Sequence, residues 1–547
     1  MNDSKLTIET KVRRLIHYIQ DLEKGLLQIP PFQRDKAWDN NKRKDLFDSL
    51  KNGYPIGSIL LWKPTETIFN KSIEKIGPCT VVSEKVSSFF YILDGFQRLS
   101  TLFGCLIDPD KTKIPIDREE WRKEFFICYD LEKEEFFIPR INNKIEVFQV
   151  PLYKLIDTRA SYNLEKALHK AMYDETLIEV YMDRAVRLGA TIVDYVLPST
   201  EITGGSVEDA VDIFSRVNSK GSIISPDWMV SALSYNKDEK GFRLGSDIDD
   251  LVDELKVYNF DSIKREILFQ CIINSFGKVH FDQITKSNTT QIEKLVKRKD
   301  FVETTKKTIE NIKKAVQFLF EELLVVDSKL LSYGNQLIFI TDFFNQVEKP
   351  SQLQLEKLKK WFWITTYSGY FTMYSLSKQR EAYNQFQTFL QNEENEPVYN
   401  DKPSLPFDVT EFPNKIYFGS VRAKSLLLFM LNYTNNFNKI DAQYIEGLNL
   451  NYLFYDERDD KGNFPPQSAI AVLDTLQAKF PKSRDMSFML ENYQLAYLHD
   501  YFLTEEMSQI FLRKEENYKS IILEKRKGLI VEAERKFVEN IGMIYNV

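Results

Sequence analysis

The 547-residue chain has little of what metal, redox and membrane sites usually need. It contains four histidines and four cysteines, and the cysteines are scattered without a CxxC pair. This pattern argues against a zinc site and indicates buried thiols in a reducing compartment. No apolar run approaches the roughly 20 residues that cross a bilayer, and the first residues lack the apolar core of a signal peptide. We therefore expect a cytoplasmic protein with no membrane partner.

The chain also lacks a surplus of positive charge. Its 73 lysines and arginines against 80 aspartates and glutamates give a formal net charge of −7. Contact with nucleic acid would therefore have to come from a local basic patch and not from overall attraction. Hydrophobic residues make up 43% of the chain and charged residues 28%, as in ordinary globular proteins. A chain of this length is expected to form about two to four domains.

One stretch, YILDGFQRLSTLFGCL at residues 91–106, combines a strand, a polar turn and a helix. The apolar residues at 89–93 indicate a strand buried on both faces. Asp94-Gly95 is a turn signal, and apolar residues then recur at helical spacing. The first N–H groups of such a helix lack partners and lie next to Arg98, which favours a bound anion. The alternative is a plain strand-to-helix corner in which Asp94 caps the helix and Arg98 is solvated.

Three polar clusters stand out against apolar surroundings and together offer what a nucleoside triphosphate needs. Their members are Gln33 and Arg34; residues 94–98 (Asp94, Gly95, Phe96, Gln97 and Arg98), with the polar Ser100 and Thr101 just after them; and Arg216, Asn218 and Gly221. Each cluster lies at the end of an expected element, where binding sites are common, although each pattern alone is also frequent on ordinary surfaces. Arginine forks match phosphate oxygens, Asp94 could hold Mg²⁺ or polarise a water, and Gln97 could position that water. The G-x-x-x-x-G-K-S/T pattern is missing, so such a site is not a P-loop.

The remaining sequence predicts a compact α/β unit followed by a mainly helical region. In the first part we expect helices over residues 7–27 and 41–52, an extended segment over 28–34, a strand over 56–62 and a hairpin over 123–140. An amphipathic segment follows at 162–188. Beyond residue 226 we expect helices over 265–276, 301–324, 352–370 and 420–432, with a polar loop over 391–413.

Four blocks in order, IPPFQR, GYPIGSILLW, ILDGFQRLSTL and IFSRVNSKGSIIS, resemble the N-terminal domain of GmrSD-type restriction endonucleases. That family has a ParB/sulfiredoxin-like fold marked by an Asp-Gly-Gln-Gln-Arg motif. The resemblance implies binding and hydrolysis of a nucleoside triphosphate, coupled to restriction of phage DNA. By position, Asp94, Gly95, Gln97 and Arg98 fall on this motif, and Gln33, Arg34, Arg216 and Asn218 fall on its companion blocks. We expect Asp94 and Gln97 to be catalytic and Asp94 also to hold Mg²⁺. We expect the other residues, together with Ser100 and Thr101, to bind the nucleotide. One departure is Phe96, which stands where the family usually has the first glutamine of the motif. A hydrophobe there either changes only packing or removes a group that orients water.

Members of the family often end in an HNH-type nuclease domain built around a His-His-Ile-Phe-Pro stretch. Residues 456–470, DERDDKGNFPPQSAI, are similar around Phe464, but residues 460–462 occupy the place of the histidines. An HNH site needs a histidine to activate water, and His499 stands alone in a helical segment. We therefore expect this domain not to cut DNA. Basic residues nearby could still contact phosphates: Lys514, Lys519, Lys525, Arg526 and Lys527.

These observations predict an α+β protein, with a ParB/sulfiredoxin-like α/β domain at residues 1–235, a helical domain at 236–435 and a degenerate HNH-like domain at 436–547. The expected function is an NTP-binding and hydrolysing component of a bacterial anti-phage restriction-type defence system, with Mg²⁺ and a nucleoside triphosphate as cofactors. Contact with DNA is expected, direct or through a partner. One alternative is a non-hydrolysing nucleotide sensor or DNA-binding regulator of a partner nuclease; another is a DNA-nicking ParB-like nuclease. A partner nuclease or a homo-oligomer is compatible with each.

Overall fold

The structure is a computed structural model. It describes residues 6–30, 38–65, 73–82, 88–140, 144–206, 209–210, 213, 242, 244–277, 294–475, 484–491 and 499–546. The chain divides into two compact units, residues 1–245 and 246–547. The domain limits predicted after residues 235 and 435 stay predictions. Among the described helices, none combines the length and apolar composition that a bilayer span requires.

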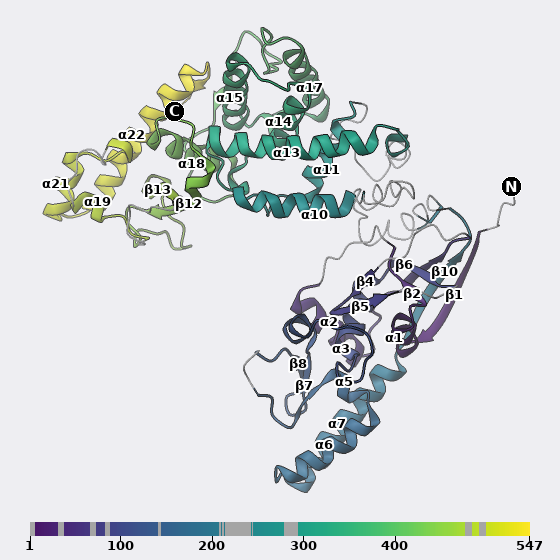
Figure 1. Cartoon of the computed structure of the whole chain (residues 1–547). Coiled ribbons are helices and arrows are strands. Elements are labelled where there is room, and N and C mark those ends of the chain that lie inside the picture. Colours follow the sequence, from purple (N-terminus) through teal and green to yellow (C-terminus); the bar gives the residue numbers. More distant parts are fainter. Residues whose placement is uncertain are drawn as a thin grey trace. The chain divides into compact units, whose positions relative to one another are not determined.

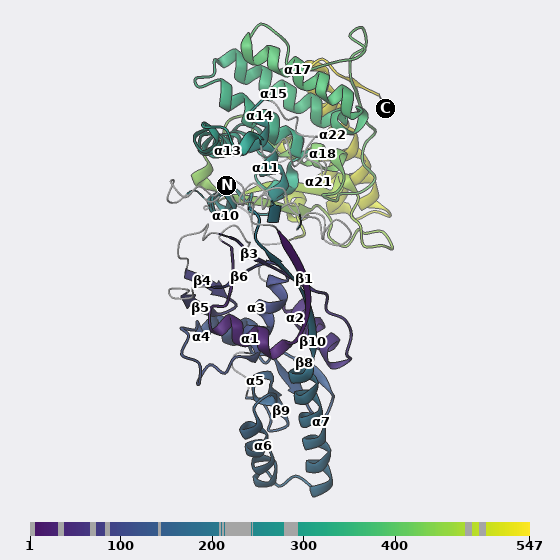
Figure 2. The same cartoon turned by 90° about the vertical axis from the view of Figure 1, so that its right-hand side faces the viewer.

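The first unit is built on a five-stranded sheet with the order β1-β10-β3-β6-β2 (Figures 1 and 2). Its strands are β1 (Thr7–Arg14), β10 (Val196–Thr203), β3 (Ile59–Lys63), β6 (Phe90–Asp94) and β2 (Leu27–Gln28). The pairs β1/β10 and β3/β6 are antiparallel, whereas β10/β3 and β6/β2 are parallel. One core joins the sheet to α1 (Leu15–Glu23), α2 (Asn40–Lys51), α3 (Phe96–Leu106) and α7 (Glu175–Asp194).

The helix predicted over residues 7–27 is wrong in its first half. Residues 7–14 form strand β1, and only α1 (Leu15–Glu23) is helical. All eight residues of β1 pair with β10, from Thr7 opposite Thr203 to Arg14 opposite Val196. β-Branched residues, which favour strands, are frequent in this segment. The deciding interaction comes from a distant strand, so a helical spacing seen in a local window could not reveal it.

Smaller elements complete the first unit. The hairpin predicted over residues 123–140 is confirmed as β7 (Cys128–Asp130) and β8 (Glu135–Phe137), with β9 (Gln149–Pro151) on the other side of β7. A separate hairpin consists of β4 (Ile73–Ile76) and β5 (Cys79–Val82). Short helical turns are α4 (Arg118–Glu120), a π-helical turn (Trp121–Phe125) and α5 (Leu152–Leu155). The amphipathic segment at 162–188 is the helical hairpin α6 (Thr158–Lys170) and α7, which extends away from the sheet in both ribbon views (Figures 1 and 2).

The second unit is mainly helical, so the predicted α+β class holds for the chain. Its longer helices are α10 (Leu244–Glu254), α11 (Arg265–Asn274), α13 (Phe301–Leu323), α14 (Gly334–Gln346), α15 (Gln352–Tyr367), α17 (Leu376–Gln391), α18 (Val421–Thr434), α21 (Glu505–Arg513) and α22 (Tyr518–Asn540). Short helices are α16 (Tyr370–Met373) and α19 (Phe488–Glu491). Strands β12 (Ile445–Tyr452) and β13 (Ala469–Thr475) form an antiparallel pair, and β11 (Asp408–Val409) pairs in parallel with β14 (Ile544–Tyr545).

Candidate functional site

The turn between β6 and α3 has the predicted strand, turn and helix. β6 ends at Asp94, Gly95 takes a left-handed conformation with φ of 91°, and α3 begins at Phe96. A Cβ at residue 95 would lie 2.5 Å from Cδ1 of Ile59 and 3.3 Å from Nη2 of Arg98. Glycine therefore supplies both the backbone angle and the close approach to β3 that this turn requires.

Arg98 is held at the start of α3 by two hydrogen bonds. Its Nη1 donates to the carbonyl oxygen of Ile56 at 2.7 Å, and its Nη2 donates to Oδ2 of Asp94 at 3.1 Å. The side chain of Arg98 is 15% exposed and that of Asp94 33%. Burial lowers the pKa of Arg98, and the Asp94 carboxylate acts in the opposite direction. The plain-corner alternative is wrong in both parts, because Arg98 is largely buried and Asp94 does not cap α3.

The loop before β3 completes the surroundings of this guanidinium. Gly57 has φ of 89°, and a Cβ there would lie 2.5 Å from Nη1 of Arg98. From the other side, the Tyr195 hydroxyl donates to the carbonyl oxygen of Tyr54 at 2.8 Å and accepts from the N–H of Ile56 at 3.2 Å. The loop is therefore fixed between Tyr195 and Arg98. Sequence reasoning named the GYPIG block but missed these roles, and no sequence signal pointed to Tyr195.

The N-terminus of α3 can attract an anion. Its N-cap residue is Gly95, so no side chain of the described residues caps the first N–H groups of the helix. Unpaired N–H groups at a helix start carry partial positive charge. Gln97 is half-buried in this first turn and precedes Arg98, which pairs with Asp94. A carboxylate, an amide and a guanidinium thus occur within five consecutive residues, and the carboxylate and guanidinium are in contact.

The other predicted residues of this cluster point into the fold. The Ser100 hydroxyl accepts from the N–H of Gly77 at 2.8 Å and so fixes the turn between β4 and β5. Thr101 is buried on the same helix. Phe96 is 4% exposed and belongs to the core of the first unit. The nucleotide-binding role of Ser100 and Thr101 stays a prediction, and in this structure both side chains serve packing.

Gln33, Arg34, Arg216 and Asn218 lie outside the described residues. Their convergence on Arg98 therefore stays a prediction. Among the described residues, no group of three or more histidine, cysteine, aspartate or glutamate side chains could hold a metal ion. Asp94 offers a single carboxylate, which suits Mg²⁺ bound chiefly through nucleotide phosphates and water.

Residues 15–233 match the family model of the GmrSD restriction endonuclease, N-terminal domain. The N-terminal part of this chain is therefore similar to that domain. An uncharacterized protein of Methanocaldococcus jannaschii is 23% identical over 482 residues, which cover 80% of this chain and 78% of the relative. The similarity thus continues beyond the GmrSD domain into the helical second unit.

The basic residues expected to contact DNA near the C-terminus are largely engaged within the protein. Lys519 forms an ion pair with Asp456, and Lys525 pairs with Glu506 at 2.9 Å. Arg526 is 1% exposed and donates to the carbonyl oxygens of Gln467, Ala469 and Tyr501. The expectation that Arg526 contacts phosphates is therefore wrong, because a buried guanidinium bound to three carbonyls cannot reach them.

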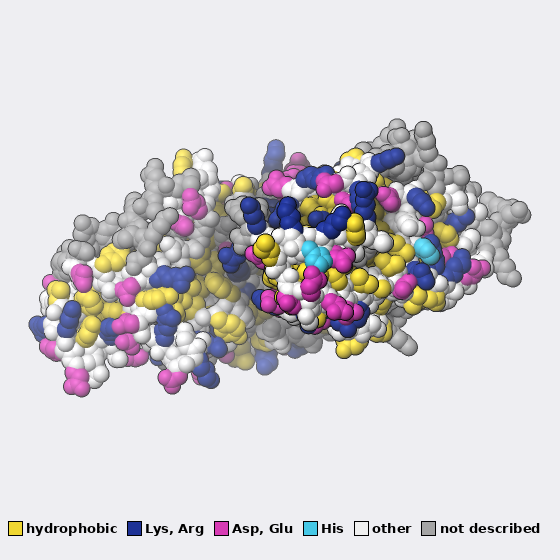
Figure 3. Space-filling model, turned by 90° about the horizontal axis from the view of Figure 1, so that it is seen from below, with side chains coloured by type: hydrophobic (Ala, Val, Ile, Leu, Met, Phe, Trp, Pro, Cys, Tyr) yellow, Lys and Arg dark blue, Asp and Glu magenta, His cyan; other side chains and the backbone are white. Residues whose placement is uncertain are grey.

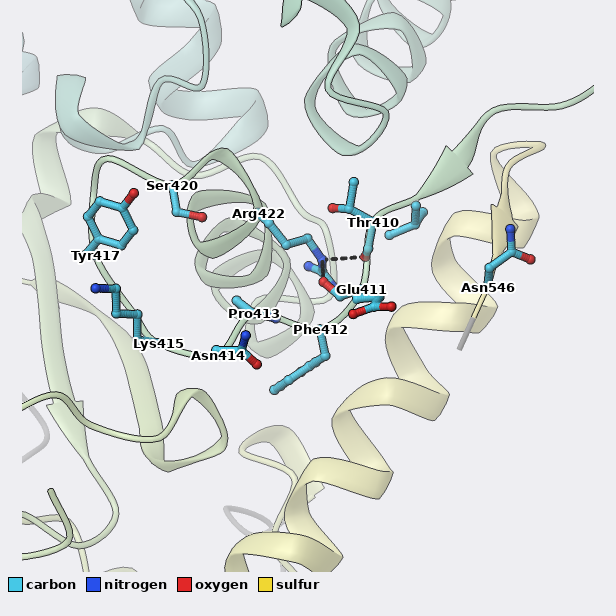
Figure 4. A pocket seen from close by; sticks show the side chains of 11 residues that line it. Thr410, Glu411, Phe412, Pro413, Asn414, Lys415, Tyr417, Ser420, Arg422 and Asn546 are labelled. Carbon is cyan, nitrogen blue, oxygen red and sulfur yellow. Dashed lines mark hydrogen bonds between the residues drawn. The ribbon is translucent and has the colours of Figure 1, made fainter. Parts of the chain in front are cut away.

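The second unit also contains an open cavity of about 670 Å³ (Figure 4). The residues that line it are Val409, Thr410, Glu411, Phe412, Pro413, Asn414, Lys415, Tyr417, Ser420, Arg422 and Asn546. Arg422 is not available to a ligand there, since it donates to both carboxylate oxygens of Glu534, at 2.8 and 2.6 Å, and to the carbonyl oxygen of Thr410 at 3.0 Å. Glu534 also accepts from the hydroxyls of Tyr367 and Tyr545. This network ties α18, α22 and β14 together. The cavity therefore lies beside a buried ion pair that stabilises the fold, and we do not interpret it as a binding site.

Proposed function

We propose that the first unit binds a nucleoside triphosphate at the turn between β6 and α3 and hydrolyses it with Mg²⁺, as part of restriction-type defence against foreign DNA. The observation that supports this most is the Arg98 guanidinium, fixed by Ile56 and Asp94 beside the uncapped start of α3. The similarity of residues 15–233 to the GmrSD N-terminal domain supports the restriction context.

Each residue of the turn has a distinct part in the proposal. An arginine carries five N–H donors, so after its bonds to Ile56 and Asp94 the Arg98 side chain retains donors for phosphate oxygens. The N–H groups at the start of α3 bind the same phosphate. Gln97 would orient the attacking water, and Asp94 would hold Mg²⁺, which supplies positive charge to neutralise the phosphates. Arg34 and Arg216, with Gln33 and Asn218, would complete the phosphate contacts.

Binding is tested by the thermal stability of the full-length protein with each NTP and Mg²⁺. At a ligand concentration of 100 Kd, linkage adds about 2.7 kcal/mol, or roughly 5–10 °C for a domain of this size. Arg98→Met should abolish the shift, because it removes the fork but keeps much of the side-chain volume. The control is Arg118→Met in the same unit, where an exposed arginine pairs with exposed Asp110. An equal shift in the wild type and Arg98→Met would refute the site.

Hydrolysis is tested separately by phosphate release. Asp94→Asn should stop the release of phosphate while nucleotide binding is partly retained, because the amide keeps the shape of the carboxylate and loses its charge. Absence of phosphate release from the wild type with every NTP would refute the hydrolase assignment and leave only binding.

A second function, nucleotide sensing without hydrolysis, is favoured by Phe96. Its ring lies in the core, so the position where the family usually has glutamine contributes no amide to the turn. A sensor would bind NTP without turnover. Gain of phosphate release in Phe96→Gln would identify this position as the one at which hydrolysis was lost; turnover in the wild type would refute the sensor.

A further inference from the structure

We propose that Arg458 and Arg484 form a phosphate-binding site for a nucleic-acid strand beside β12 and β13. The inference uses the proposed function only in taking nucleic acid as the partner. It concerns the second unit, whereas the proposed NTP site lies in the first.

Tyr455 brings the two arginines together. The Arg458 guanidinium lies over the Tyr455 ring, 4.1 Å from its centre, and Nε of Arg458 donates to the Tyr455 carbonyl oxygen at 3.1 Å. Nη1 of Arg484 donates to the Tyr455 hydroxyl at 3.1 Å. One tyrosine therefore contacts both guanidinium groups, and both arginines are exposed. The site is preorganised, which lowers the entropy cost of binding.

Three of the acidic residues nearby have partners other than the two arginines. Asp456 and Glu457 pair with Lys519, and Asp459 accepts from the N–H groups of Lys461 and Asn463 and from the Asn463 amide. Within the described part of the chain, no carboxylate forms an ion pair with Arg458 or Arg484. The two exposed guanidinium groups therefore keep donors that can bind the oxygens of a phosphate.

The aromatic surroundings favour a nucleic-acid strand. The Arg458 guanidinium also lies 4.6 Å from the centre of the Phe464 ring, which stacks on Tyr452 at 3.5 Å between ring centres. Arginine beside aromatic rings is a common way to hold single-stranded nucleic acid, and guanidinium edges match the oxygens of a phosphodiester. On the face shown in Figure 3, basic and acidic side chains are interspersed over the described residues. Contact with a strand therefore needs a local site of this kind.

The test is fluorescence anisotropy of the full-length protein with a labelled single strand and a labelled duplex over about 50–200 mM NaCl. Each phosphate contact adds about 0.7 to the slope of log affinity against log salt for a single strand, and about 0.9 for a duplex. The double variant Arg458→Gln, Arg484→Gln should lower the single-strand slope by about 1.4. Tyr455→Phe keeps the ring below Arg458 but removes the hydroxyl that holds Arg484. The affinity of this variant for the single strand should therefore lie between those of the wild type and the double arginine variant.

The matched control is Lys294→Gln with Lys299→Gln, which removes two exposed charges from the same unit. An equal fall in slope for both double variants would show a general charge effect and overturn the site. Tighter binding of a phosphorylated peptide than of the single strand would overturn the nucleic-acid assignment. Thermal unfolding checks that each variant is folded. The two proposals fail in different experiments. If NTP does not raise the melting temperature of the wild type, only the proposed function is refuted. If the double arginine variant binds DNA as the wild type does, only the Arg458–Arg484 site is refuted.

Discussion

Gly57→Ala tests whether the placement of Arg98 matters. The new Cβ would lie 2.5 Å from Nη1 of Arg98, closer than real contacts allow. The guanidinium is the movable partner, so it would be displaced, and its bonds to Ile56 and Asp94 would break. The substitution therefore moves the proposed phosphate-binding group without changing it chemically.

The expected cost in unfolding free energy has two parts. Placing a side chain at φ of 89° costs about 1–2 kcal/mol. Loss of the hydrogen bonds adds about 1–2 kcal/mol after a discount for the partly exposed Asp94. Gly53→Ala provides the control, because Gly53 has φ of 68° but a Cβ there would meet nothing within 4 Å. We expect a loss of about 2–4 kcal/mol for Gly57→Ala and about 1–2 kcal/mol for Gly53→Ala.

The assay is urea unfolding of both variants, followed by NTP titration. Gly57→Ala should weaken nucleotide binding by about tenfold or more, the equivalent of one charged hydrogen bond, whereas Gly53→Ala should leave it unchanged. Equal stability losses and equal nucleotide affinities in the two variants would refute the reasoning. The close approach of Gly57 to Arg98 would then contribute neither to stability nor to nucleotide binding.

Two further predictions concern the second unit. Glu534 is 0% exposed and paired with Arg422. Glu534→Gln should therefore lower the free energy of unfolding, measured in urea, by about 3–5 kcal/mol. Glu532→Gln, at an exposed pair with Lys536, should leave it nearly unchanged, and equal effects of the two substitutions would contradict this prediction. Burial raises the pKa of Asp342 above its usual 3.8, so the folded state holds that proton more tightly than the unfolded state and loses stability as the pH rises above 3.8. In Asp342→Asn this loss of stability with rising pH should be absent. If the unfolding free energies of the wild type and Asp342→Asn change with pH in parallel, the raised pKa of Asp342 is contradicted.

The strand, turn and helix around Asp94 could be predicted because their signals are local. An apolar run, an Asp-Gly pair and helical spacing follow one another directly, and the same holds for α2, α13 and α18. Strand β1 could not be predicted, because its partner β10 lies far along the chain and its short apolar pattern also fits a helix.

Only those residues of the candidate site that lie close together in the sequence could be predicted. Asp94, Gln97 and Arg98 were named from the sequence, and the ion pair between Asp94 and Arg98 spans a single helical turn. The bond from Arg98 to Ile56 joins residues 42 positions apart, and that from Tyr195 to Tyr54 joins residues 141 positions apart. Backbone carbonyls accept these bonds, and a carbonyl leaves no signature in the amino-acid sequence.

The pairing of β10 between β1 and β3 sets the order in which the sheet is completed during synthesis. β3 and β6 are close in the chain and can pair early, but the edge of β3 waits for residues 199–203. β1 waits longest, since Thr7 pairs with Thr203. At about 5–20 residues per second, the ribosome needs roughly 10–40 s to make the intervening chain. For that time the first strand has no partner, and the β3 edge is open for the later part of it. We therefore expect a chaperone to have its greatest effect on this protein before β10 emerges.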